Sequence, residues 1–148
     1  RIFHTPGHTT GGIVYCVEDA AFTGDTLFSA GCGRLFEGTA EMMHHSLNGV
    51  LGGLDDSTRV FCGHEYTQKN IAFARRVDLE NGNVIAREKE VAKLRSHGEP
   101  TVPSTLGLER ETNPFLRCAD PQIRAHLALQ DGSDADVFAA LRKIRDGS

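Results

Sequence analysis

Four short apolar runs, punctuated by glycine, constrain the fold of this chain more than any other feature. The runs cover residues 2–3, 12–17, 20–22 and 59–62. Their near-continuous apolar content, rich in β-branched and aromatic residues, favours strands that are buried on both faces. Residues 39–47, between the last two runs, predict a crossover helix with Thr39 as its N-cap. This order of elements predicts an α/β sandwich with its chemistry at the strand ends.

After residue 64 the pattern changes from strands to helices. Helical periodicity and capping residues predict helices over about residues 65–78, 84–96, 121–129 and 134–145. The polar stretch from Pro103 to Pro114 is expected to be an ordered loop or a connector. The later part of the chain is therefore expected to be helical.

Apolar spacing indicates which helical faces are buried. The expected buried positions are Tyr66, Phe73 and Val77 on the first helix, Ile85, Val91 and Leu94 on the second, and Val137, Leu141 and Ile144 on the last. On the second helix, Arg87 is expected to face solvent. Ser133 caps the last helix, from which Arg142 and Arg145, three residues apart, are expected to project together.

Composition excludes several classes of protein. The chain has 148 residues, enough for a sizeable core, and its formal charge of -4 argues against a general nucleic-acid binder. No apolar run approaches the roughly 20 residues of a membrane helix. The four cysteines form no C-x-x-C pair, and Cys32 is expected to be a small buried side chain rather than a nucleophile. We therefore expect a cytoplasmic protein that binds neither nucleic acid nor membrane.

Three residues that can bind a metal each follow a glycine directly. They are His8, Asp25 and His64, and each stands beside one of the apolar runs. Taken singly, a histidine is more often a structural or surface residue, and an aspartate after glycine is often a turn or capping residue. Two imidazoles and one carboxylate nevertheless form a ligand set suited to zinc, manganese or iron. The repeated junction predicts a metal site that is assembled from loops.

These junctions resemble the later metal motifs of the metallo-β-lactamase superfamily. The resemblance rests on Thr-Pro-Gly-His-Thr at 5–9, Gly-Asp-Thr-Leu-Phe at 24–28 and Gly-His-Glu-Tyr-Thr at 63–67. Residues 31–39, Gly-Cys-Gly-Arg-Leu-Phe-Glu-Gly-Thr, are similar to the glyoxalase II, or hydroxyacylglutathione hydrolase, family. The resemblance implies an α/β fold: the later half of a metallo-β-lactamase αββα sandwich over 1–64, then an all-α substrate-binding C-terminal domain over 65–148.

The resemblance also implies an activity and a ligand set. A binuclear enzyme of this family hydrolyses S-(2-hydroxyacyl)glutathione, typically S-D-lactoylglutathione to D-lactate and glutathione in methylglyoxal detoxification. Its cofactors are two divalent metal ions, zinc with iron or manganese as alternatives. His8 would bind the first ion and His64 the second, while Asp25 bridges both and is catalytic through the metal-bound hydroxide. The glutathione thioester would be bound by the side chains Arg34, Tyr66, Arg142 and Arg145, and the protein is expected to be a monomer.

Two alternatives stay open. The superfamily motif Thr-His-x-His-x-Asp-His, which supplies further metal ligands, does not occur in these residues. The chain is therefore expected to be the C-terminal part of such an enzyme and to be inactive alone, or to bind only glutathione or a partner. The second alternative is a persulfide dioxygenase of the same superfamily, which shares a Gly-Cys-Gly-Arg loop and uses a single iron.

Overall fold

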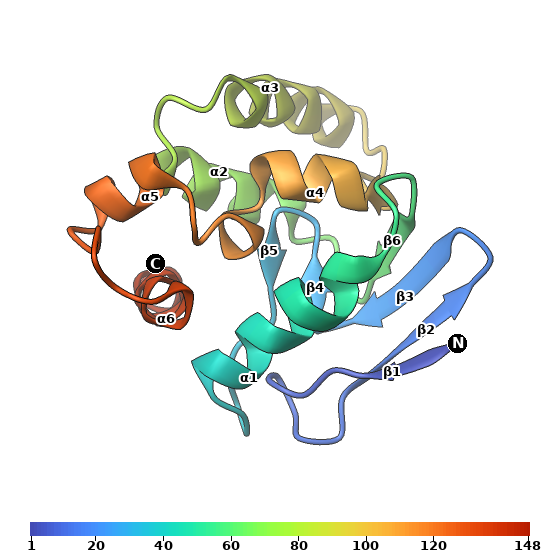
Figure 1. The fold of residues 1–148 in the computed structure, drawn as a ribbon. Helices are drawn as coiled ribbons and strands as arrows, with labels where there is room; N and C mark the ends of the chain where they lie inside the picture. The colour runs from blue at the N-terminus through green and yellow to red at the C-terminus, as the bar shows by residue number, and fades with distance from the viewer.

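The four predicted strands and one further strand, β7, form one mixed sheet. In the computed structural model, which describes residues 1–148, the strands are β1 (Ile2–His4), β2 (Ile13–Val17), β3 (Ala20–Gly24), β6 (Arg59–Cys62) and β7 (Ser104–Thr105). Their order in the sheet is β1-β2-β3-β6-β7 (Figure 1). Strands β3 and β6 are parallel, and the other neighbours are antiparallel. Strands β4 (Leu27–Phe28) and β5 (Gly31–Cys32) form a separate antiparallel hairpin.

The parallel pair β3–β6 requires a crossover, and the predicted helix supplies it. Helix α1 (Ala40–His44) continues into a π-helical segment, His45–Val50, and a 3₁₀ turn, Leu51–Gly53. The predicted N-cap is confirmed, because the Thr39 hydroxyl accepts a hydrogen bond from the Met42 amide at 3.2 Å. The side chains of Met43, Leu47 and Leu51 are fully buried. The α/β architecture expected from the sequence is therefore confirmed.

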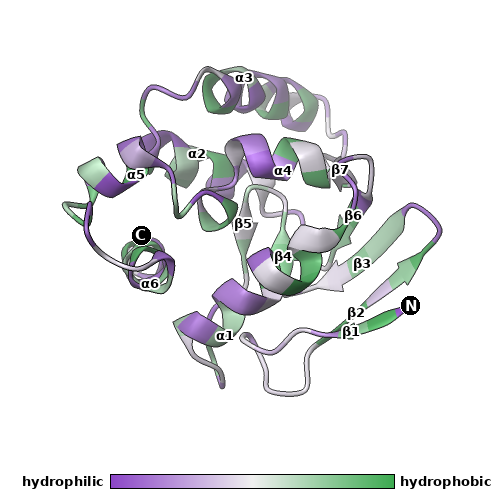
Figure 2. Ribbon diagram, in the orientation of Figure 1, coloured by the Kyte–Doolittle hydropathy of each residue, from purple (hydrophilic) through white to green (hydrophobic).

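The other face of the sheet is exposed, so the expectation of strands buried on both faces is wrong. In the strand register Ile2 lies opposite Tyr15, and Tyr15 lies opposite Phe22. These three side chains are 65%, 48% and 46% exposed, whereas Val14 on the opposite face is fully buried. Figure 2 shows the apolar colouring of β1 to β3. Strand alternation separates a covered face from an uncovered apolar one.

Five α-helices follow β6 in the chain, with β7 between the second and the third of them. They are α2 (Thr67–Val77), α3 (Gly82–Ser96), α4 (Leu106–Thr112), α5 (Pro121–His126) and α6 (Asp134–Asp146), with a 3₁₀ turn at Pro114–Leu116. The predicted connector at 103–114 contains β7 and α4. The Thr105 hydroxyl caps α4 by accepting the Leu108 amide. No helix combines the length and apolar character needed to cross a membrane.

Three expected buried or exposed positions are wrong. Tyr66 is 46% exposed, because it stands just before the first residue of α2. The other two are wrong because a charged side chain has a distant partner. Arg87 is 6% exposed and pairs with the fully buried Glu109 at 2.6 Å. On α6, Ile144 is 37% exposed, and Arg142 takes the buried position beside Leu141. The predicted Ser133 cap of α6 is confirmed as a capping box with Asp136. Periodicity assigns arginines to solvent because it contains no information on distant partners.

One hydrophobic core joins the sheet to the helices. It contains Val14 and Val60 from the sheet, Leu47 from the crossover, and Phe138 and Leu141 from α6. The strands and the α6 helix are therefore held by the same apolar contacts. This packing fixes the loops at the strand ends against the final helix.

The one-sided burial of the sheet can be tested by paired substitutions. Leu47→Ala should lower the free energy of unfolding by about 2–5 kcal/mol, because it leaves a cavity in the buried face. Val17→Thr keeps a β-branched side chain on the exposed face and should change it by less than about 0.5 kcal/mol. Urea denaturation measures both values. Equal losses in the two variants would contradict this description of the sheet.

Candidate metal and substrate-binding site

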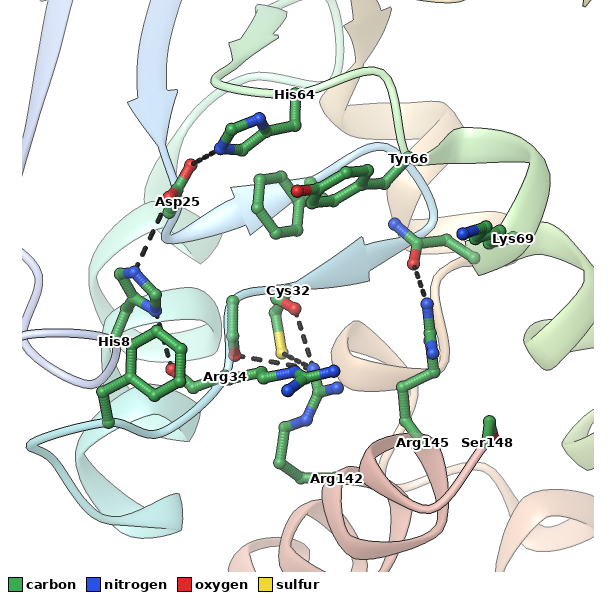
Figure 3. A pocket seen from close by; sticks show the side chains of 14 residues that line it. His8, Asp25, Cys32, Arg34, His64, Tyr66, Lys69, Arg142, Arg145 and Ser148 are labelled. Atoms are coloured by element: carbon green, nitrogen blue, oxygen red, sulfur yellow. Dashed lines mark hydrogen bonds and ion pairs between the residues drawn. The ribbon is translucent and has the colours of Figure 1, made fainter.

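Three loops at the strand ends meet at the carboxylate of Asp25. His8 Nε2 lies 3.6 Å from Asp25 Oδ2, and His64 Nε2 lies 3.4 Å from Asp25 Oδ1 (Figure 3). Asp25 and His64 follow the parallel strands β3 and β6, whose carboxyl ends lie at the same edge of the sheet. The three predicted ligands are therefore neighbours, and each imidazole faces a different oxygen of one carboxylate.

Glycines allow the backbone to approach Asp25 closely. A Cβ at Gly63 would lie 2.5 Å from Asp25 Oδ1, and a Cβ at Gly33 would overlap the Asp25 carbonyl oxygen. The Gly63 amide donates to the Gly24 carbonyl at 2.8 Å, which joins two of the loops. Glycine is thus required around Asp25 because there is no room for a side chain.

Hydrogen bonding orients His8 for ligation. Its Nδ1 lies 2.8 Å from the carbonyl oxygen of Arg34. Because a carbonyl can only accept, Nδ1 carries the proton and Nε2 presents its lone pair towards Asp25. His64 is oriented by stacking on the ring of Tyr66, with centroids 4.7 Å apart. A backbone carbonyl on the distal ring nitrogen is a common support for a metal-binding histidine.

The donor chemistry fits a divalent metal. Imidazole nitrogens and carboxylates are typical ligands of zinc, and each histidine lies beside its own carboxylate oxygen. No three donor groups of the chain converge on a single point. The two imidazoles face opposite oxygens of Asp25 and do not converge on one point.

A cavity of about 560 Å³ opens beside Asp25. All residues predicted as site residues line it, together with others that the sequence analysis did not single out. The predicted ones are His8, Asp25, Arg34, His64, Tyr66, Arg142 and Arg145. Figure 3 shows the histidines and Asp25 at one end and Arg142, Arg145 and Ser148 at the other. The cavity thus connects a metal-binding end to a basic end.

The basic end carries more positive than negative charge. Arg34, Lys69, Arg142 and Arg145 line the cavity, and Asp25 is its only acidic residue. Burial, followed by repulsion from Arg142 and Arg34, lowers the pKa of Arg145 below its usual range. Clustered cations of this kind attract an anionic ligand.

The sequence predicted that Arg142 would project from the helix, but it does not project freely. Its side chain is 6% exposed, and Nη1 donates to the Cys32 carbonyl at 2.8 Å. The guanidinium also pairs with Asp146 and lies over the ring of Phe115. Arg142 therefore forms part of the cavity wall and holds the segment that leads to Arg34. Burial raises the pKa of the Cys32 thiol to about 11, so the thiol stays protonated at neutral pH and is a poor nucleophile.

Lys69 and Asn70 line the cavity but were missed from the sequence. Both lie in the first turn of α2, just after Tyr66. Asn70 Nδ2 donates to the Ser29 carbonyl, and its Oδ1 lies 3.4 Å from Arg145 Nη2. The spacing of Lys69 three residues after Tyr66 is a signal that could have found it, because such positions share a helix face.

Comparison with known proteins first defines the class of fold. Residues 1–64 match the model of the metallo-β-lactamase superfamily. The crystal structure of BLEG-1 B3 metallo-β-lactamase is 26% identical, with a TM-score of 0.51, and the match covers 78% of this chain and 40% of that one. ETHE1 from Myxococcus xanthus is 24% identical, with a TM-score of 0.55 and coverage of 98% and 52%. The fold is that of the metallo-β-lactamase superfamily.

The family within that class follows from the helical part and from sequence identity. Residues 65–148 match the model of the hydroxyacylglutathione hydrolase C-terminus. The chain is 53% identical over 148 residues to the hydroxyacylglutathione hydrolases of Brucella ovis and of Brucella abortus (strain 2308). Each match covers 99% of this chain and 57% of the relative. The chain therefore belongs to the hydroxyacylglutathione hydrolase family. It spans 57% of the length of these relatives. Its fold and family imply divalent metals.

The close packing around Asp25 predicts the effect of a single methyl group. Gly33→Ala should lower the free energy of unfolding by at least about 2 kcal/mol, because the new Cβ overlaps the Asp25 carbonyl oxygen. Gly53→Ala is the matched control, since nothing lies within 4 Å of its Cβ, and should change that free energy by less than about 0.5 kcal/mol. Chemical denaturation distinguishes the two, and a tolerated Gly33→Ala would show that Asp25 is not held in this way.

Proposed function

We propose that this chain supplies the metal-bridging and substrate-binding part of an enzyme that hydrolyses S-(2-hydroxyacyl)glutathione thioesters, typically S-D-lactoylglutathione. The observation that supports this most is the single carboxylate of Asp25 facing two histidines beside a basic cavity. The relatives named above are hydroxyacylglutathione hydrolases. Water would attack the thioester carbonyl, giving a 2-hydroxy acid and the glutathione thiol.

We propose two divalent ions, with zinc first and iron or manganese as alternatives. His8 with Asp25 Oδ2 would hold one ion, and His64 with Asp25 Oδ1 would hold the other. When bound, such a pair of metals supplies Lewis-acid polarisation of a carbonyl group and lowers the pKa of water. The residues of this chain fix the two imidazoles on opposite oxygens of Asp25. Because a thiolate is a weak base, the leaving group needs no strong general acid from the protein.

The basic end of the cavity would bind the glutathione moiety. Glutathione carries two carboxylates, and a guanidinium can bind a carboxylate through two hydrogen bonds. We assign direct contacts to Arg34, Tyr66 and Arg145, with Lys69 as a further cation at the same end. Arg142 would act from the cavity wall, where it holds the Cys32 carbonyl. The thioester would then lie towards Asp25, which Figure 3 shows at the opposite end of the cavity from Arg145.

The division of the chain also belongs to this proposal. Residues 1–64 would form the later half of a metallo-β-lactamase sandwich, and residues 65–148 the helical substrate-binding domain. The exposed row of Ile2, Tyr15 and Phe22 supports a second sheet packed on that face in the complete enzyme. Strand β7, from the helical part, pairs with β6 and links the two parts. The complete enzyme is proposed to act as a monomer.

Hydrolysis by the complete, metal-loaded protein tests the proposal. The unmodified protein should release free thiol from S-D-lactoylglutathione, and Asp25→Ala should abolish both metal loading and turnover. Arg145→Met should raise KM about tenfold while sparing the metal content, because it removes a charged hydrogen-bond donor from the cavity. Arg95→Met is the matched control, since Arg95 only caps the end of α3 by donating to the Glu99 carbonyl. Full turnover by Asp25→Ala, or oxygen consumption with a persulfide and one iron per chain, would contradict the proposal.

A further inference from the structure

A buried polar cluster surrounds the turn between β4 and β5 and has no part in the chemistry proposed above. We call Glu109, Arg87 and Asn113 the turn clamp. All three belong to the helical part of the chain, and their exposures are 0%, 6% and 0%. The turn itself, residues 28–31, belongs to the strand-end region that leads into the cavity.

Glu109 is the centre of the turn clamp. Its Oε2 accepts hydrogen bonds from the Ala30 amide at 2.7 Å and from Asn113 Nδ2 at 3.0 Å. Its Oε1 accepts from Arg87 Nη2 at 2.6 Å and from the Ser104 hydroxyl at 2.7 Å. Both oxygens are therefore fully used, and the positive charge of Arg87 balances the buried carboxylate.

The turn clamp contacts every residue of the turn. Besides the Glu109 contact with Ala30, Asn113 Nδ2 lies 3.0 Å from the Gly31 carbonyl and 3.3 Å from the Phe28 carbonyl. Arg87 Nη2 donates to the Ser29 hydroxyl at 3.1 Å. Ala30 has a φ of 61°, a left-handed conformation that costs free energy for a residue with a Cβ. This conformation persists because surrounding groups hold it.

The turn connects two groups at the substrate end of the cavity. On one side, the ring of Phe28 packs edge-on against Tyr66, with centroids 5.3 Å apart. On the other side, β5 leads directly through Gly33 to Arg34. Asp25 has supports of its own in the β3–β6 pairing and the Gly63–Gly24 hydrogen bond, although Gly33 packs on its carbonyl and the Arg34 carbonyl contacts His8 Nδ1. A loosened turn should therefore disturb substrate binding more than the metal ligands.

A buried ion pair is weak evidence for stability, because apolar residues of similar volume are often as stabilising. The charge of Glu109 and the four hydrogen bonds that its carboxylate accepts do, however, specify one conformation of the turn. We infer that Glu109 is a positioning residue, whose carboxylate fixes the 28–31 turn so that Phe28 and Arg34 are set for the substrate. The link to substrate rests on the proposed function; the link to the turn does not.

Glu109→Gln in the complete, metal-loaded protein tests the inference. An amide has one accepting oxygen, which should turn to Arg87 and leave an NH₂ group facing the Ala30 amide. Hydrogen exchange of the amides in residues 29–31 should become faster on the order of tenfold. KM for S-D-lactoylglutathione should rise about tenfold, below the hundredfold that a misplacement of about 1 Å can cause. Both kcat and metal content should stay within about twofold, because Asp25 keeps its support from the β3–β6 pairing.

Asp78→Asn is the matched control. Asp78 is also a buried carboxylate, 1% exposed, and it accepts from Arg117 Nε at 3.0 Å and from Asn81 Nδ2 at 2.7 Å. It follows the C-terminal end of α2, roughly 12–14 Å along the helix from the cavity residues Lys69 and Asn70. Asp78→Asn should lower thermal stability but leave KM and the exchange of residues 29–31 unchanged.

The outcomes separate the inference from the proposed function. Unchanged exchange in Glu109→Gln, an unchanged KM, or an equal rise of KM in Asp78→Asn would each overturn the inference. If the unmodified protein does not hydrolyse the thioester, the proposed function fails, and hydrogen exchange alone decides whether Glu109 fixes the turn. Faster exchange confined to the turn, together with the selective rise in KM, is the expected result.

Discussion

The shared carboxylate of Asp25 is the constraint on which the rest of the site depends. Its two oxygens face His8 and His64 at 3.6 and 3.4 Å, so one side chain lies between both imidazoles. This arrangement requires three loops to approach within contact distance. The parallel pairing of β3 with β6 brings two of the loops together, and glycines at 33 and 63 leave the space that a Cβ would fill.

The helical part of the chain completes the cavity and fixes it in place. Tyr66 and Lys69 come from the start of α2, and Arg142 and Arg145 from α6. The same helices share one hydrophobic core with the sheet, so their positions relative to Asp25 are set by packing. Buried arginines add specific links across the chain, because Arg142 binds the Cys32 carbonyl and Arg87 binds Glu109 beside the β4–β5 turn. The basic end of the cavity is thus tied to the loops that carry His8, Asp25 and His64.

The sequence predicted the parts of the molecule that local patterns encode. Apolar runs located β1, β2, β3 and β6 but missed the two-residue strands β4, β5 and β7. Thr39 and Ser133 marked helix starts, and the glycine junctions identified His8, Asp25 and His64 as neighbours. It failed where a partner is remote. Arg87 is buried because it pairs with Glu109, which is 22 residues away in the sequence. Arg142 is buried where it donates to the Cys32 carbonyl, which is 110 residues away. The apolar strands gave no sign that one sheet face is uncovered, since apolar content is the same whether or not a partner is present.

The most direct test of the account is crystallographic. Anomalous diffraction from the complete, metal-loaded protein locates each ion and its ligands. The account predicts that Asp25 Oδ2 and His8 bind one ion, and that Asp25 Oδ1 and His64 bind a second ion. A single ion bound by both histidines, or two ions with Asp25 on only one of them, would contradict the central role given to this carboxylate.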